Sequence, residues 1–308
     1  MIPFLIMTMF RSESNGFTIR RLLLLLLAFF LGLAMVMILR GCQLYKDIDM
    51  TKIQTRMNVA LGDIHLPFLD RTAVKMALNF IRDQKPGRIH LLGDVCDMYS
   101  VSAYDKDPNR RLNLQDELDT VRDWLTELRD AAPRAKIIYS EGNHEFRLKK
   151  YLRSEAKALA GLRALSLDKL LDFDKLKIKW QPHDRPYRLG HLLFTHGSLI
   201  SKWSAASAKR HFERYGCCTI HGHTHRLGAF YHTDISDVYG SWENGCLCSL
   251  TPDYMTAPDW QHGFSVVWSE RSGFFHVDQV AIVCGQYCWN GRVIGKKRDT
   301  PHVVEDIA

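Results

Sequence analysis

Three apolar segments in the first half of the chain each end at a short polar motif, and a helix-like segment follows. The segments and their motifs are 57–61 with Asp63-Ile64-His65, 88–92 with Gly93-Asp94, and 135–139 with Gly142-Asn143-His144. Strands that alternate with helices in this way predict a largely parallel sheet with crossover helices. Ligand sites in such sheets form beyond the carboxyl ends of the strands, so these polar side chains are expected to meet.

The connecting segments have the spacing of amphipathic helices. Residues 71–82 repeat apolar side chains at helical intervals, and Pro86-Gly87 follows them. Residues 114–131 form a second such segment, which Pro133 stops. The chain has 308 residues, of which 46% are hydrophobic and 24% charged, so it can bury a sizeable core and wholesale disorder is excluded.

The second half of the chain is richer in short strands. Residues 192–195 predict a strand that ends at His196, and residues 218–220 predict one that ends at Gly222-His223, with a helix over 205–215 between them. Four further segments are short, aromatic and β-branched, and they are expected to form antiparallel strands. These segments are 229–233, 238–242, 265–269 and 274–282.

Five polar motifs follow one another in a fixed order along the chain. They are Asp63-Ile64-His65, Gly93-Asp94-Val95-Cys96-Asp97, Gly142-Asn143-His144-Glu145, Thr195-His196-Gly197 and Gly222-His223-Thr224-His225. A carboxylate has two oxygens, so Asp94 can bridge two ions, and Asn143 offers a neutral oxygen. Nitrogen and oxygen ligands without thiolate suit Mn, Fe or Zn better than Ca. Two ions roughly 3.5–4 Å apart would clamp a phosphate and activate a bridging water.

The ordered motifs resemble those of the calcineurin-like metallophosphoesterase superfamily, whose pattern is DxH, GDxxD, GNH(D/E), H and GHxH. The match covers residues 58–225. The resemblance implies an α/β fold of two packed mixed β-sheets flanked by helices, and hydrolysis of phosphoester bonds with two divalent metal ions.

The resemblance also implies a role for each motif residue. Asp63, His65 and His225 would hold the first metal, Asp94 would bridge, and Asn143, His196 and His223 would hold the second. His144 would be the general acid that protonates the leaving oxygen, or a cation that stabilises the phosphorane, and Asp97 would orient it.

One motif departs from the Ser/Thr protein phosphatases of this superfamily. Those enzymes have Asp-Arg-Gly where this chain has Asp97-Met98-Tyr99, so the protein-phosphatase interpretation is disfavoured. Arg147 is a candidate substitute, because a guanidinium suits phosphate geometry, or else a surface charge. Three alternatives stay open: a nuclease acting on DNA or RNA, a pyrophosphohydrolase of lipid precursors, and a non-catalytic metal-binding scaffold.

Two segments near the motifs are candidates for substrate contact. Residues 99–111 combine tyrosines with basic side chains and are expected to lie over the metal site. Residues 145–163, if helical, carry a row of basic side chains, which is either a solvated face or a nucleic-acid surface. The net charge of +7 suits an anionic partner.

The N-terminal region differs from the rest of the chain. Residues 22–39 are uncharged and apolar, Arg20-Arg21 precede them and Arg40 follows. An 18-residue helix would be about 27 Å long, close to the thickness of a bilayer core, so a transmembrane helix is expected. The alternatives are a cleaved secretory signal, a lipoprotein cleavage site at Cys42, and a true translation start at Met50 or Met57.

The expected organisation has three parts. They are an N-terminal segment 1–49, a phosphoesterase domain 50–290 and a C-terminal tail 291–308. The chain has eight cysteines without a disulfide framework, which favours reduced, mostly buried thiols and a catalytic domain in the cytoplasm, with membrane attachment through 22–39. Cys246-Leu247-Cys248 and the pair Cys284 and Cys288 lack CxxC spacing, so a four-cysteine zinc knuckle is disfavoured.

Overall fold

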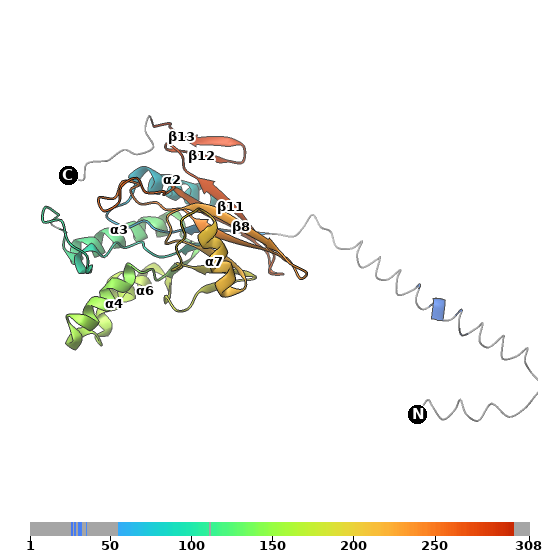
Figure 1. Ribbon diagram of the computed structural model, residues 1–308, viewed down its shortest axis with the longest axis horizontal. Coiled ribbons are helices and arrows are strands. Elements are labelled where there is room, and N and C mark those ends of the chain that lie inside the picture. Colours follow the sequence, from blue (N-terminus) through green and yellow to red (C-terminus); the bar gives the residue numbers. More distant parts are fainter. Residues whose placement is uncertain are drawn as a thin grey trace, which may run out of the picture. The chain divides into compact units, whose positions relative to one another are not determined.

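The computed structural model describes residues 55–110 and 112–298, and a few helical positions between 26 and 35. The chain divides into two compact units, 1–54 and 55–308, and the fold described below is that of the second unit (Figure 1). Its core is a mixed six-stranded sheet. The strands in order are β11 (Phe275–Ala281), β10 (Gly263–Ser269), β1 (Arg56–Leu61), β2 (Arg88–Leu91), β3 (Lys136–Ser140) and β4 (Ile178–Gln181).

The strands β1 to β4 are parallel to one another, as the alternation of strands and helices predicts. The crossover helix α2 (Arg71–Gln84) joins β1 to β2, and α3 (Leu114–Ala131) joins β2 to β3. Both helices start at residues whose side chains accept a backbone hydrogen bond from the first turn, Asp70 for α2 and Asn113 for α3. The strands β10 and β11 extend the sheet in antiparallel fashion, as expected.

A second mixed sheet has five strands. In order they are β5 (Tyr187–Leu189), β6 (Leu192–Thr195), β7 (Cys218–His221), β9 (Val238–Asn244) and β8 (Leu227–Thr233). The pair β8–β9 is antiparallel, but β7 pairs with both β6 and β9 in parallel. The helix α7 (Ala206–Tyr215) packs on β7, β8 and β9.

Alternating side chains of β1 show how the layers are arranged. Val59 and Leu61 belong to the core cluster that contains the buried faces of α2 and α3. Ala60, between them, belongs to a second cluster with Phe194 of β6 and Ile220 of β7. The first sheet is therefore covered by helices on one face and by the second sheet on the other, which confirms the expected arrangement of two packed mixed sheets flanked by helices.

The remaining elements are short. They are α4 (Glu145–Ser154), α5 (Leu167–Leu170), α6 (Phe173–Leu176), the 3-10 turns η2 (Tyr99–Val101), η3 (Lys157–Leu159) and η4 (Arg163–Leu165), and the hairpin β12 (Gln286–Trp289) with β13 (Arg292–Gly295). The α-helix in the basic segment 145–163 thus ends at Ser154, and the turns η3 and η4 follow it. The strand β13 lies within the region that the sequence assigned to a tail, and the domain boundaries stay a prediction.

The transmembrane helix predicted over residues 22–39 is wrong. Among the residues that the structure describes, no helix is both long and apolar enough to span a membrane. An apolar run is a property of composition, whereas a span also needs an unbroken helix of about 20 residues. The described helical positions are Leu26, Ala28, Phe30, Leu31, Gly32 and Met35, and the rest of the run lies outside the described residues.

The layer between the sheets contains an uncharged histidine. His90 of β2 is buried and its ring stacks on Phe194, with ring centroids 3.8 Å apart and an interplanar angle of 10°. Burial lowers the pKa of His90 to about 3, with a smaller contribution from Arg88. The imidazole therefore packs as a neutral aromatic ring that joins the two sheets.

We expect Phe194→Ala to destabilise the protein by about 3–5 kcal/mol, because it removes a buried ring and leaves a cavity against His90. Urea denaturation measures this change. The control is Ile235→Ala, since Ile235 is fully exposed and its truncation should leave stability within about 0.5 kcal/mol. Equal stability of the two variants would contradict the packing described.

Candidate metal centre

The polar motifs lie at the carboxyl ends of strands from both sheets. Asp63 and His65 follow β1, Asp94 follows β2 and Asn143 follows β3, all in the first sheet; His196 follows β6, and His223 and His225 follow β7, in the second. The structure brings all seven predicted metal ligands together at this edge.

Five of these seven residues have an uncommon backbone conformation. Asp63, His65, Asp94, His223 and His225 have φ between 50° and 69°. Residues other than glycine are uncommon in this left-handed region, although Asp and His enter it more readily than most. Tight backbone turns thus point several side chains inward at once.

The first cluster joins ligands from both sheets. The Nε2 atom of His225 lies 3.3 Å from Oδ1 of Asp63 and 3.1 Å from Nε2 of His65. Asp63 is completely buried, and both its carboxylate oxygens accept hydrogen bonds from the backbone N–H of His223, at 2.9 and 3.0 Å.

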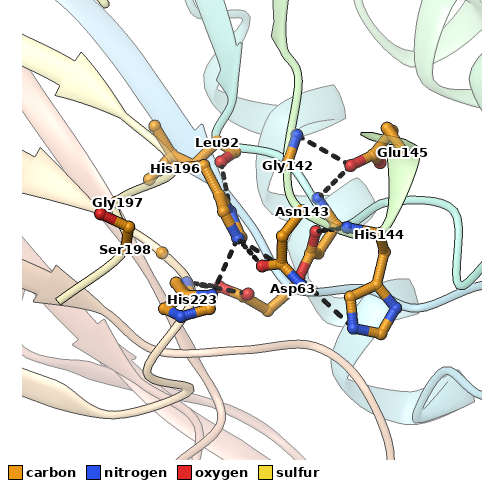
Figure 2. A network of polar contacts seen from close by, with 12 residues as sticks. Asp63, Leu92, Gly142, Asn143, His144, Glu145, His196, Gly197, Ser198 and His223 are labelled. Atoms are coloured by element: carbon orange, nitrogen blue, oxygen red, sulfur yellow. Dashed lines mark hydrogen bonds and ion pairs between the residues drawn. The ribbon is translucent and has the colours of Figure 1, made fainter. Parts of the chain in front are cut away.

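The second cluster is centred on His196. Its Nε2 lies 2.8 Å from Oδ1 of Asn143 and 3.1 Å from Nδ1 of His223 (Figure 2). The same atom lies 3.3 Å from Oδ2 of Asp94. Its Nδ1 lies 3.0 Å from the carbonyl oxygen of Leu92 and donates to it. In the neutral imidazole Nε2 then carries a lone pair that faces three other lone-pair atoms.

This arrangement fits two cations. In each cluster a carboxylate and two imidazoles converge on one point. A cation at that point would remove the repulsion between their lone pairs, because it accepts lone pairs from all of them. The Oδ2 atom of Asp94 is 3.3 Å from His196 in the second cluster and 3.8 Å from His65 in the first, so Asp94 lies between them. The donor set matches the one expected for Mn, Fe or Zn.

The electrostatics of the two clusters also favour positive charge. Burial lowers the pKa of His196, but Asp94 raises it to about 9. By contrast, burial and the neighbouring His196 lower the pKa of His223 to about 4, so His223 is neutral and can act as a ligand. The buried carboxylates therefore demand a cation, and without a metal ion a histidine proton takes that place.

His144 lies beside Asp94 and is held by two neighbours. Its Nδ1 is 2.8 Å from the carbonyl oxygen of Asp97 and donates to it. Its Nε2 is 2.9 Å from the guanidinium of Arg147 and accepts from it, and 3.8 Å from Oδ2 of Asp94. Arg147 also donates to the Asp97 carbonyl at 3.0 Å. The predicted catalytic residues His144, Asp97 and Arg147 are thus in mutual contact, while their roles stay predictions.

Asp97 contacts a metal ligand as well as His144. Its Oδ2 lies 3.1 Å from Nδ1 of His65 and 3.3 Å from Nδ1 of His144. Burial opposes ionisation, but hydrogen bonds from His144 and His65 hold the pKa of Asp97 well below its usual range. A carboxylate that accepts Nδ1–H fixes the tautomer, so that Nε2 of His65 is free for a metal. The contact with His65 could not be found from the sequence, because nothing in the motif spacing distinguishes the two histidines.

Glu145 joins two of the motif loops. Its carboxylate is buried and accepts five hydrogen bonds, from the backbone N–H groups of Asp94, Val95, Cys96 and Gly142 and from the Tyr139 hydroxyl, at 2.7–3.1 Å. The loops pass so closely that a Cβ at Gly142 would collide with Asp94 and Glu145. The sequence identifies Glu145 as the last residue of its motif but does not indicate this role.

Comparison with known proteins places the chain in a family. No family model matches it. The gene 54 protein of Mycobacterium phage D29 is 30% identical over 253 residues, which cover 76% of this chain and 97% of that protein. The chain belongs to the family of the mycobacteriophage gene 54 proteins. The gene 54 protein of Mycobacterium phage L5 is 29% identical over 252 residues, with the same coverage.

Solved structures give weaker similarities. The Zn²⁺ complex of Vps29 from Entamoeba histolytica has a TM-score of 0.40 at 12% identity, over 78% of this chain and 97% of that one. The phosphoesterase YfcE from E. coli has a TM-score of 0.33 at 15% identity, over 73% of this chain and 99% of that one. A dimetal phosphatase from Danio rerio has a TM-score of 0.36 at 14% identity, over 73% of this chain and 95% of that one. TM-scores below 0.5 carry no argument about this chain. The five motifs meet at one site in a fold of two packed mixed sheets, as the resemblance to calcineurin-like metallophosphoesterases implies.

We expect Glu145→Gln to weaken both folding and metal binding. An amide offers one accepting oxygen, and its NH₂ group would face backbone N–H donors, so at least one buried donor loses its partner at a cost of about 1–3 kcal/mol. Urea denaturation and metal content after gel filtration measure the two effects. The control is Glu155→Gln, at the exposed end of α4. Unchanged stability and metal content in Glu145→Gln would refute the role of Glu145 in holding the two motif loops together.

Proposed function

We propose that this protein is a metal-dependent phosphoesterase that works with two divalent cations. The observation that carries the proposal is the convergence of Asp63, His65 and His225 on one point and of Asp94, Asn143, His196 and His223 on another. When bound, the cations would supply Lewis acidity to the phosphoryl group and to the attacking water.

The protein groups around the clusters have separable tasks. Asp97 holds His144 by its backbone carbonyl at Nδ1, which leaves Nε2 turned towards Asp94 and Arg147. In the structure, the Arg147 guanidinium donates a hydrogen bond to Nε2 of His144. An anionic phosphoryl group would draw the guanidinium to itself, because charge-assisted bonds to phosphate are stronger than bonds to a neutral imidazole. Once Arg147 leaves Nε2, that atom would take up a proton from solvent, which it could donate to the leaving oxygen.

We expect His144→Ala to keep its metal and lose about 10²–10⁴-fold in turnover, the usual contribution of a general acid. The measurement is hydrolysis of an aryl phosphodiester with Mn²⁺, together with metal content. The control is His276→Ala, an exposed histidine on β11 that pairs with Asp278. Turnover equal to that of the unaltered protein would sink the proton-donor role.

A nuclease is the second candidate, favoured by rings and cations beside the centre. Arg110 lies over Phe68, 4.7 Å from the ring centroid, and Arg147 lies 5.8 Å from the centroid of Tyr104, whose side chain is exposed. The exposed side of α4 and the turns after it carry Lys149, Lys150, Arg153, Lys157 and Arg163. Exposed rings and a basic track are what single-stranded nucleic acid requires.

A substrate panel with Mn²⁺ separates the candidates. It contains an aryl phosphomonoester, an aryl phosphodiester, a nucleoside diphosphate-lipid and single-stranded DNA. A nuclease is expected to bind DNA with an affinity that falls linearly with salt on a log–log scale. It should also lose about 1–3 kcal/mol of binding free energy in Tyr104→Ala but not in Tyr231→Ala, a second exposed tyrosine. The scaffold alternative predicts no turnover with any member of the panel.

A further inference from the structure

The histidine ligands differ in what their second ring nitrogen faces. His65 Nδ1 lies 3.1 Å from the Asp97 carboxylate, and His196 Nδ1 lies 3.0 Å from the Leu92 carbonyl. These are the usual partners of a metal-binding imidazole. His225 departs from this rule, because its Nδ1 faces the thiol of Cys248 at 3.7 Å.

A second thiol completes a group of three soft donors. Cys246 Sγ, Cys248 Sγ and a ring nitrogen of His225 all lie within 4.8 Å of one another. Both cysteines are buried, at 0% and 3% exposure, and both are free thiols. Nothing in the proposed hydrolysis uses them.

The backbone around the thiols is firmly anchored. The N–H groups of Leu247 and Cys248 both donate to the carbonyl oxygen of Asp63 at 3.0 Å. The N–H group of Cys246 donates to the carbonyl oxygen of Gln261, also at 3.0 Å. The backbone that carries both thiols is therefore fixed by hydrogen bonds to two other segments.

We propose that Cys246, Cys248 and Nδ1 of His225 form a separate site for one thiophilic divalent cation, such as Zn²⁺ or Cd²⁺. His225 would be shared, because its Nε2 faces Asp63 and His65 in the first cluster. The proposed hydrolysis is not a premise of this site.

The chemistry of the donors makes the site selective. Thiolate ligands select soft cations, whereas Mn²⁺ and Mg²⁺ prefer oxygen. Binding would release the two thiol protons, which a thiophilic cation can displace and a hard one cannot. When the first cluster also holds an ion through Nε2 of His225, the ring N–H proton at Nδ1 is released as well, because a neutral imidazole has only one nitrogen lone pair. The CxC spacing, which argues against a four-cysteine knuckle, is no obstacle here, since the third ligand comes from the loop after β7.

A cavity lies beside residues that neighbour the thiols. It has a volume of about 250 Å³, and Trp260, Gln261 and His262 line it. Gln261 and His262 are the backbone neighbours of Cys246, and the Trp260 ring lies 4.1 Å from the ring of His225. The cavity therefore adjoins residues that contact Cys246 and His225.

Occupancy of this site should alter the first cluster. An imidazole binds two cations through its two nitrogens only after it loses its ring N–H proton, and the two cations then repel each other across the ring. We therefore expect the first cluster to bind its own metal less tightly once the thiol site is filled.

Cobalt titration of the metal-free full-length protein tests the proposal. Co²⁺ bound to thiolate gives an intense near-ultraviolet charge-transfer band, which nitrogen and oxygen ligands do not give. We expect this band in the unaltered protein and in Cys218→Ser, which removes a buried thiol of β7 in the second sheet. We expect about half of it in Cys246→Ser and in Cys248→Ser, and none in the double variant.

Two results would overturn the site: no thiolate band in the unaltered protein with excess Co²⁺, or a band retained in the folded double variant. If circular dichroism shows that the double variant is unfolded, X-ray absorption of the Zn²⁺-loaded unaltered protein decides. Sulfur neighbours at about 2.3 Å support the site, and a shell of nitrogen and oxygen alone refutes it.

Discussion

The candidate metal centre depends on the hydrogen bonds that the buried carboxylate of Glu145 accepts. This carboxylate accepts hydrogen bonds from the loop that carries Asp94 and from the loop that carries Asn143, so one side chain sets the distance between two strand ends. Backbone N–H groups at tight turns lie beyond the reach of strand pairing, and each would cost about 1–3 kcal/mol if left unpaired. The two oxygens of the Glu145 carboxylate pair with such N–H groups in both loops.

The same loops hold their ligands in an unfavourable conformation. Left-handed φ values at Asp63, His65 and Asp94 cost on the order of 1 kcal/mol each. The backbone bonds that compensate run between the loops: Asp63 donates to the Gly93 carbonyl at 3.1 Å, and His65 donates to the Asp94 carbonyl at 2.9 Å. Strain in one loop is thus tolerated because the next loop is in contact with it.

The sequence predicts the strands and helices that position the site because each has a strong local signal. The apolar run of β1 and the helical spacing of α2 need no knowledge of the rest of the chain. The short strands β4 and β5 lack such a signal, since their side chains are partly exposed, and they form only because a neighbouring strand is present. The apolar run at 22–39 shows the opposite case, in which composition suggests more than the described structure bears out.

The site, like the fold, is predictable from the sequence only where the signal is local. Ligand identities can be read from short motifs, and all seven residues converge as expected. Contacts that depend on distant segments cannot be read in this way: Glu145 receives bonds from residues about 50 positions earlier, and Cys248 reaches His225 from 23 positions later. Such partners carry no local pattern.

Each metal cluster takes ligands from both sheets, with Asp63 and His65 facing His225, and Asp94 and Asn143 facing His196 and His223. Bound cations would therefore cross-link the two sheets, which are otherwise joined by apolar packing. An ion that binds only the folded state adds RT ln(1 + [L]/Kd) to its stability, about 2.7 kcal/mol at a hundredfold excess over Kd. Metal supply would then regulate how much of this protein is folded as well as how much is active.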